Sequence, residues 1–354
     1  MSASNPVPSR PIPLGLAGRL FRQFSDLTEG GFAPAEAVAV LKEDVESPTI
    51  AGLLGEIGQD LEREPSLARA LERHASIFGP EIVALVRAAE GQNALSGGLA
   101  MLADDYERRQ QLGVRLPVSL LWPLFLLGFL AFIMMLLMIF VIPAFKEVFA
   151  GFGADLPGLT LAVIAISDLV GAYWWILLAL LIALPWGVAF VRRRQPGFGI
   201  ALDTAYLNIP GVRRFLVKLL VGRMVALFAG AAANRIPLAI TIAYLQSTLS
   251  NQSLKATVAA LGRDVEQGTP LSAAWRKHAL LPRKIARMMD IGERSNKLAP
   301  VLERAARVHG AEAASAIAVF RQVLFVTTYV LTGIIVGFMV IAMYLPIFKM
   351  GSVI

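Results

Sequence analysis

The chain of 354 residues contains no cysteine and only three histidines. Without cysteine, disulfide bonds, thiol nucleophiles and thiolate-bound metals are excluded. The histidines lack the His-Glu-x-x-His spacing of a zinc hydrolase, and the sequence has neither a Gly-x-Ser-x-Gly elbow nor a Gly-x-x-x-x-Gly-Lys-Ser/Thr phosphate loop. We therefore expect no enzymatic activity, and we predict no catalytic residue, no metal site and no cofactor.

Charge is also scarce in this sequence. Asp, Glu, Lys and Arg make up 17% of the residues, and none of them occurs in residues 116–145, 169–191 or 322–348. A helix rising about 1.5 Å per residue needs roughly 20 apolar residues to cross the hydrocarbon core of a bilayer, and each stretch exceeds that length. A mean hydropathy of +0.62 also indicates a membrane protein. We predict three transmembrane helices, at residues 116–145, 166–191 and 322–348.

Basic residues gather at one end of each apolar stretch. Arg115 precedes the first, Arg192-Arg193-Arg194 follow the second, and Arg321 precedes the third. Because cytoplasmic flanks carry the excess of Lys and Arg in membrane proteins, the N-terminus and both soluble regions are predicted to be cytoplasmic, and the C-terminus periplasmic. The net charge of +7 then reflects a lipid bilayer, not a nucleic-acid partner, since most basic residues flank the spans.

The regions outside these stretches show the periodicity of amphipathic helices. Leu53, Ile57 and Leu61 recur every four residues, and Ser47-Pro48 offers a capping hydroxyl before a proline at a first helical position. Because no alternating strand pattern is present, the predicted fold class is all-α. It is a polytopic membrane protein with two repeated cytoplasmic helical-bundle domains and three transmembrane helices. The expected order is a flexible tail (1–15), a first cytoplasmic domain (16–112), a first span (116–145), a short periplasmic loop (146–160), a second span (166–191), a second cytoplasmic domain (200–318), a third span (322–348) and a periplasmic C-terminus (349–354).

An internal repeat relates the two predicted domains. Residues 20–149 match residues 223–350 at an offset of 202 to 204. The matched pairs include Ala33-Pro34 with Ile236-Pro237, His74 with His278, Pro80 with Pro282, Glu90 with Glu293, Asn93 with Asn296, and Pro143-Ala144-Phe145-Lys146 with Pro346-Ile347-Phe348-Lys349. The repeated unit is a helical domain with one exit helix. The middle span returns the chain, so that both domains share one side of the membrane.

Glu90 and Glu293 are the notable acids of the repeat, because each ends an apolar helical stretch just before a break. One interpretation is a partner contact, or a cation site shared between subunits. The other is a carboxylate that satisfies backbone groups at a structural corner. Asn93 and Asn296 are predicted to share that corner as turn or cap residues.

A second candidate site lies in the third predicted span. Gly333 and Gly337 form a Gly-x-x-x-Gly pattern, which allows two helix backbones to approach closely. We interpret the pair as helix-packing candidates in a contact between copies of the chain.

Several segments carry a resemblance to a known family. Residues 141–149 read Val-Ile-Pro-Ala-Phe-Lys-Glu-Val-Phe, and residues 153–157 read Gly-Ala-Asp-Leu-Pro. Together with Ala88-Ala89-Glu90, Ile291-Gly292-Glu293 and the closing residues 344–348, they resemble the inner-membrane platform proteins of type II secretion and type IV pilus assembly, the secretion F family. The resemblance implies two cytoplasmic six-helix bundles, three spans and no enzymatic activity.

The same resemblance implies partners and a location. The expected partners are a cytoplasmic hexameric assembly ATPase, pilin or pseudopilin subunits, other inner-membrane assembly proteins and further copies of the chain. The expected location is the bacterial inner membrane. The alternative is a subunit of a small polytopic transporter. Transport sites need ionisable groups deep in the bilayer, whereas here Asp168 lies at the outer edge of the second span and the other two spans hold none. A scaffold is therefore the favoured interpretation.

Overall fold

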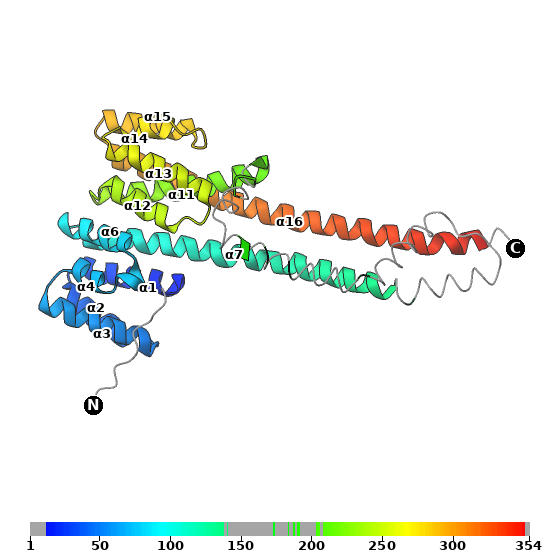
Figure 1. The fold of residues 1–354 in the computed structure, drawn as a ribbon, viewed down its shortest axis with the longest axis horizontal. Helices are drawn as coiled ribbons and strands as arrows, with labels where there is room; N and C mark the ends of the chain where they lie inside the picture. The colour runs from blue at the N-terminus through cyan, green and yellow to red at the C-terminus, as the bar shows by residue number, and fades with distance from the viewer. Residues whose placement is uncertain are drawn as a thin grey trace. The chain divides into compact units, whose positions relative to one another are not determined.

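The computed structural model describes residues 12–137, 140, 173, 183, 187, 190, 191, 203–205 and 208–350 (Figure 1). The chain divides into two units, each made of two separate segments. Unit 1 takes Met1–Val114 and Ile200–Ile317, and unit 2 takes Arg115–Gly199 and Ala318–Ile354. The predicted periplasmic loop at 146–160 lies outside the described residues, as does nearly all of the predicted span at 166–191.

The described elements are helices, with no strand among them, so the all-α prediction is confirmed for this part of the chain. What we call the first half of unit 1 contains α1 (Leu14–Glu29), α2 (Pro34–Asp44), α3 (Pro48–Arg63), α4 (Leu67–Arg73), α5 (Ala75–Phe78), α6 (Pro80–Gly91) and the beginning of α7 (Leu95–Leu136). The second half contains α11 (Pro210–Ala233), α12 (Leu238–Thr248), α13 (Gln252–Glu266), α14 (Leu271–Arg276), α15 (Arg283–Arg294) and the beginning of α16 (Leu298–Met350).

Local sequence signals explain where several of these helices begin. Pro34, Pro48 and Pro80 each stand in the first turn of a helix, where a missing N–H costs nothing. The predicted start at Ser47-Pro48 coincides with α3, although the Ser47 side chain makes no capping bond. Asn251 does cap α13, because its side-chain oxygen accepts from the Leu254 N–H at 2.9 Å.

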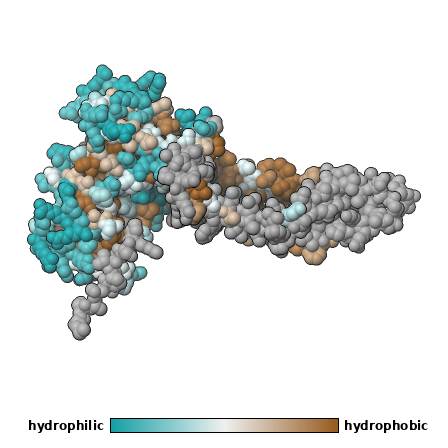
Figure 2. All heavy atoms as spheres, in the orientation of Figure 1, coloured by the Kyte–Doolittle hydropathy of each residue, from teal (hydrophilic) through white to brown (hydrophobic). Residues whose placement is uncertain are grey.

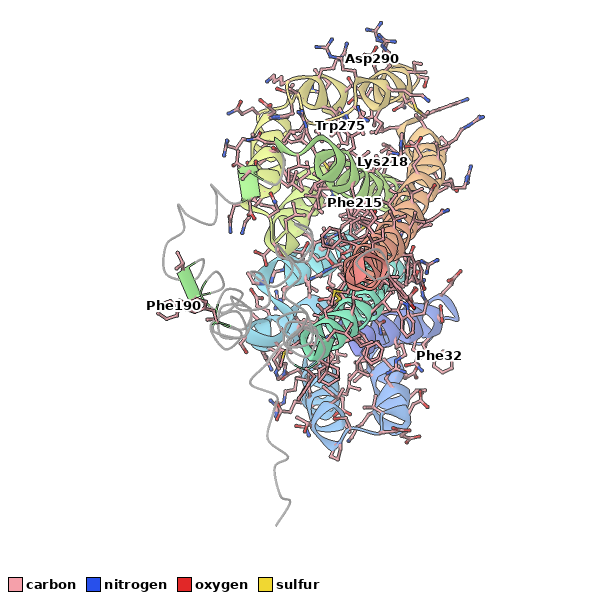
Figure 3. The ribbon with its side chains drawn as sticks, turned by 90° about the vertical axis from the view of Figure 1, so that its right-hand side faces the viewer. Phe32, Phe190, Phe215, Lys218, Trp275 and Asp290 are labelled. Atoms are coloured by element: carbon pink, nitrogen blue, oxygen red, sulfur yellow. The ribbon has the colours of Figure 1, made fainter. Side chains whose placement is uncertain are left out.

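One hydrophobic core runs through both halves of unit 1. Trp275, Tyr244 and Phe228 are its largest fully buried side chains, and Figure 3 shows Trp275 among the helices of the second half. Helix α11 is apolar enough over Gly211–Ala233 to cross a membrane by length and composition, and half of that window is buried inside the structure. Its buried side chains belong to this core, which explains its apolar composition.

Unit 2 presents apolar side chains outward. Helix α7 continues without interruption into its predicted span as far as Leu136, and α16 continues to Met350. In an apolar 18-residue stretch of α16, within Leu298–Ile341, only 11% of the residues are buried, and Leu124 and Phe125 of α7 are more than 60% exposed. In Figure 2, apolar residues in the described part of the chain are brown. Trp122 Nε1 donates to the Tyr329 hydroxyl at 3.3 Å, which joins α7 to α16 within this unit.

Candidate functional site

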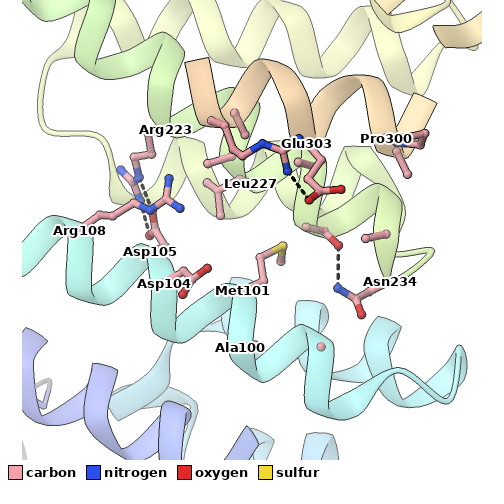
Figure 4. Close-up of a pocket in the computed structure, with 18 residues that line it drawn as sticks. Ala100, Met101, Asp104, Asp105, Arg108, Arg223, Leu227, Asn234, Pro300 and Glu303 are labelled. Carbon is pink, nitrogen blue, oxygen red and sulfur yellow. Dashed lines mark hydrogen bonds and ion pairs between the residues drawn. The ribbon is translucent and has the colours of Figure 1, made fainter. Parts of the chain in front are cut away.

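A buried polar cluster joins the two halves of unit 1. Asp105 of α7 accepts two bonds from the Arg223 guanidinium of α11, at 2.6 and 2.7 Å (Figure 4). It accepts a third from the Tyr244 hydroxyl of α12 at 2.7 Å. Arg223 also donates to the Thr248 hydroxyl at 2.6 Å. The Asp105 side chain is 1% exposed, so each charge depends on the other for compensation. This cluster fixes which surface of α11 and α12 faces α7.

Burial and charge perturb two groups of the cluster. Burial, followed by the negative charge of Asp105, raises the pKa of Tyr244 well above its ordinary value, so the hydroxyl stays protonated and donates. Burial opposes the charged form of Arg223, but the bonds to Asp105 outweigh it and raise the pKa of the guanidinium. The cluster is therefore an ion pair that also accepts a bond from a neutral phenol, and its bonds hold the helices of the two halves together.

Near this cluster, the backbones of neighbouring helices approach one another closely. A Cβ on Gly230 would lie 2.8 Å from the Cγ atom of Met101, and a Cβ on Gly98 would lie 2.5 Å from the Cβ atom of Ala89. Both distances are too short for a side chain, so glycine is needed where α7 meets α11 and α6. Helices α6 and α12 are also in direct contact. We call this contact of α6 and α7 with α11 and α12 the junction.

A groove of about 510 Å³ lies beside the junction, between α7, α11 and α16 (Figure 4). Its lining combines small residues, among them Gly97, Ala100 and Gly230, with the charged residues Asp105 and Arg223 of the cluster. Glu303 and Arg307 also line it, and Arg307 donates to Glu303 at 2.8 Å.

The structure places Glu90 at a corner between α6 and α4. Its carboxylate accepts from the Ser66 hydroxyl at 2.9 Å, from the Ala68 N–H at 3.3 Å and from the Leu67 N–H. These N–H groups belong to the first turn of α4, which has no partners for them within the helix. In this position the Glu90 carboxylate satisfies backbone groups at the start of α4.

Glu293 occupies the corresponding corner of the second half. Its carboxylate accepts from both the N–H and the hydroxyl of Ser272, in the first turn of α14. Asn93 and Asn296 follow these corners with φ of 52° and 54°, in the left-handed region that asparagine tolerates. Each is the residue after a helix end at which two backbone bonds close a Schellman motif.

The remaining candidate residues from the sequence lie outside the polar cluster, the groove and the two corners. His74 and His278 lie at matching positions, with Nε2 3.8 Å from Asp60 and 3.7 Å from Asp264. Gly333 and Gly337 lie on α16 in unit 2, and a Cβ on either would meet nothing within 4 Å. Among the described residues, no three His, Asp or Glu side chains gather as metal ligands.

Asp105, Arg223 and Tyr244 do not stand out in the sequence by any local pattern. The internal repeat does carry a signal for two of them, because at their positions one half has a polar side chain and the other half has valine. Tyr244 stands where the first copy has Val40, and Asp105 stands where the second copy has Val308. Such differences mark surfaces that the two halves use differently.

Comparison with known proteins places this architecture. The sequence matches the family "Type II secretion system (T2SS), protein F" twice, at residues 20–143 and 224–346. It is 26% identical to type IV pilus assembly protein PilC of Pseudomonas aeruginosa, over 94% of this chain and 89% of that protein. It is 27% identical to type IV pilus assembly protein TapC of Aeromonas hydrophila, over 94% and 81% of the two chains. It is 27% identical to type II secretion system protein F of Xanthomonas campestris, over 84% and 73%.

Proposed function

Because the chain belongs to the type II secretion system protein F family, we propose that it is an inner-membrane platform protein of a type II secretion or type IV pilus assembly machine. The double family match, over most of the sequence outside the middle span, carries this proposal. The absence of a phosphate loop from the sequence supports a role that holds partners and supplies no chemical energy of its own.

The proposed partners follow from the two units. Unit 1 has a buried core and charged surface helices, which suit contact with a cytoplasmic hexameric ATPase. Unit 2 exposes apolar side chains that suit lipid and the apolar helix of a pilin or pseudopilin subunit. We propose that the protein couples the ATPase to incorporation of these subunits into a fibre, beside other inner-membrane assembly proteins.

We further propose a topology of three spans, with the N-terminus and both halves of unit 1 in the cytoplasm and the C-terminus in the periplasm. The arginines that flank the apolar stretches support it. Reporter fusions after Gly153 and at the C-terminus should report periplasmic, and a fusion after Asn208 should report cytoplasmic. A cytoplasmic C-terminus would contradict the topology.

The candidate residues have proposed roles in this scaffold. Glu90 and Glu293, with Asn93 and Asn296, hold the corners of the two halves. The open surface around Gly333 and Gly337 supports a contact between helices of two copies of the chain. The protein is therefore proposed to work as a homo-oligomer.

Deletion of the gene tests the function. Fibre assembly or secretion should be lost, while the subunits are still made and stay in the inner membrane. The purified protein should show no ATP hydrolysis and should co-purify with the ATPase at low salt. Normal fibres in the deletion strain would contradict the proposal, and solute uptake by the reconstituted protein would favour a transporter instead.

A further inference from the structure

The two halves of unit 1 use equivalent surfaces differently. In the structure, residues of α1 and α2 have counterparts 204 positions later in α11 and α12, so that Ile236 corresponds to Phe32, one residue away from its sequence match with Ala33. Residues of α6 and early α7 have counterparts 203 positions later in α15 and α16. The junction pairs α6 and α7 of the first half with α11 and α12 of the second. Two counterpart surfaces therefore stay outside the junction: the outer surface of α1 and α2, and that of α15 and α16.

We define the α1/α2 face by Arg19, Asp26, Phe32 and Val40, which are the counterparts of Arg223, Gly230, Ile236 and Tyr244. We define the α15/α16 face by Ile291, Val301, Arg304 and Val308, which are the counterparts of Ala88, Gly98, Met101 and Asp105. The first set of counterparts lies on α11 and α12 or next to them, on one side of the junction. The second set lies on α6 and α7, on the other side.

Apolar residues on these faces are exposed where their counterparts are covered. Phe32 is 47% exposed and Val40 is 45% exposed, whereas their counterparts Ile236 and Tyr244 are 3% and 0% exposed. On the other face, Ile291 is 64% exposed. Figure 3 shows Phe32 pointing away from the helices of its own half. Single exposed apolar side chains are ordinary, but here they recur at the positions that the junction buries.

We propose that the α15/α16 face of one copy binds the α1/α2 face of a second copy, in the arrangement that the junction shows within one chain. The inference rests on the self-association proposed above and not on the platform role. Because the two faces differ, the contact is head-to-tail, and a bound pair of copies keeps one free face of each kind. Copies held in one membrane plane then extend by the same contact until a ring closes.

Charge supports a second copy as the occupant. The α1/α2 face and its surroundings carry exposed acids at Asp26, Glu29, Glu43 and Asp44, which outnumber the exposed bases Arg19 and Lys42. Asp26, Glu43 and Asp44 line a hollow of about 510 Å³ on this face. The α15/α16 face and its surroundings carry exposed bases at Arg287, Arg294, Lys297 and Arg304. Opposite potentials on two faces of one chain favour contact between copies and fix its direction.

One predicted pair follows directly from the junction. A side chain at Gly230 would point straight into Met101, because its Cβ would lie 2.8 Å from the Met101 Cγ atom. At the equivalent positions the sequence has Asp26 and Arg304, both exposed. The equivalent contact between copies therefore pairs a carboxylate with a guanidinium, where the junction has a glycine against a methionine. Because a side chain at Gly230 does not fit at the spacing of the junction, the two helices of this contact must lie further apart than α7 and α11 do.

Crosslinking of the full-length protein in detergent or nanodiscs tests the contact, and the absence of native cysteine makes single-cysteine variants unambiguous. Val40→Cys and Val308→Cys replace the counterparts of Tyr244 and Asp105, whose side chains are bonded at 2.7 Å. A short bismaleimide should crosslink a mixture of the two variants and neither variant alone. Crosslinks within Val40→Cys alone would show a symmetric dimer and overturn the proposal. Glu62→Cys on α3, mixed with Val308→Cys, is the matched control and should give no crosslink.

Charge exchange gives a second test, read as the yield of that crosslink. Asp26→Arg or Arg304→Asp alone should lower it roughly tenfold by placing like charges together, and the two combined should restore it. Both residues are exposed, so thermal unfolding should show that each variant is folded. Equal yields in all variants, or no crosslink while the protein still self-associates, would overturn this contact and leave the platform role standing. Crosslinks that require added ATPase would assign the faces to that partner and also overturn the proposal.

Discussion

The first and second halves of unit 1 contain similar successions of helices and the same corner carboxylate, yet they meet through surfaces that are not the same. The second half buries α11 and α12, whereas the first half leaves the equivalent surface of α1 and α2 outside the junction. The residues differ accordingly: the junction has a buried tyrosine and a partly buried glycine where the first half has Val40 and Asp26 on its surface. The positions of the helices and of the corners are alike in the two halves. The residues on their surfaces differ, because each half makes different contacts.

The largest expected effect comes from removing the ion pair that makes the halves different. Asp105→Ala leaves the largely buried Arg223 without a counter-charge, since only its bond to the neutral Thr248 hydroxyl remains, which should cost about 3–5 kcal/mol of unfolding free energy. The adjacent Asp104 is a matched control, because it is 51% exposed and pairs with the partly exposed Arg22. Asp104→Ala should cost about 1 kcal/mol or less. Denaturant unfolding in detergent, followed by circular dichroism, should separate the two; equal losses would contradict the role of Asp105 at the junction.

The sequence predicts much of each half but little of the junction. Prolines at first helical positions and the apolar spacing in α3 are local signals, so helix starts such as Pro48 can be inferred from neighbouring residues. The corner at Glu90 is suggested because the repeat places an acid at the same helix end twice. Asp105 and Arg223 are 118 residues apart, and no local pattern indicates that they meet. Burial of an unremarkable arginine depends on how the halves pack, which periodicity does not encode.

The corners offer the next comparison. Glu90 accepts bonds from two backbone N–H groups and a hydroxyl, while Glu293 accepts from one N–H and one hydroxyl. Glu90→Ala should therefore destabilise the protein by about 1–3 kcal/mol and Glu293→Ala by less, since fewer donors lose their partner. Glu90→Gln keeps an acceptor and should recover part of the loss. Equal stability of wild type and Glu90→Ala would reject the corner role.

A smaller difference is expected at the turns after α1 and α11. Gly31 and Arg235 occupy equivalent turns with positive φ, at 91° and 55°. A left-handed conformation costs a side-chain-bearing residue roughly 1–2 kcal/mol, partly offset by the extra freedom of glycine in the unfolded chain. Arg235→Gly should therefore raise the unfolding free energy by about 0.5–1 kcal/mol, and Gly31→Arg should lower it by at least as much. Thermal unfolding midpoints that move in the same direction would contradict this.

The smallest effect concerns alkaline pH. Burial and the charge of Asp105 hold the pKa of Tyr244 above its ordinary value of 10. A raised pKa in the folded state means that this contribution to stability is complete below about pH 10 and is lost as the pH rises through the folded pKa. Tyrosinate absorbance in the wild type and in Tyr244→Phe should show no difference at pH 10, because Tyr244 is still neutral there. A difference spectrum at pH 10 would show that the hydroxyl is not held by Asp105.

The amides that donate to the corner carboxylates can be used to follow the opening of each half by hydrogen exchange. The first amides of a helix normally exchange with deuterium at once, because they have no partner within the helix. Here the amides of Leu67 and Ala68 donate to Glu90, and the amide of Ser272 donates to Glu293. Their exchange requires α4 to separate from α6, or α14 from α15, and not merely a frayed end. Deuterium uptake at these amides therefore times the opening of each half separately in the intact chain, and a partner that pulls on one half would speed exchange there alone.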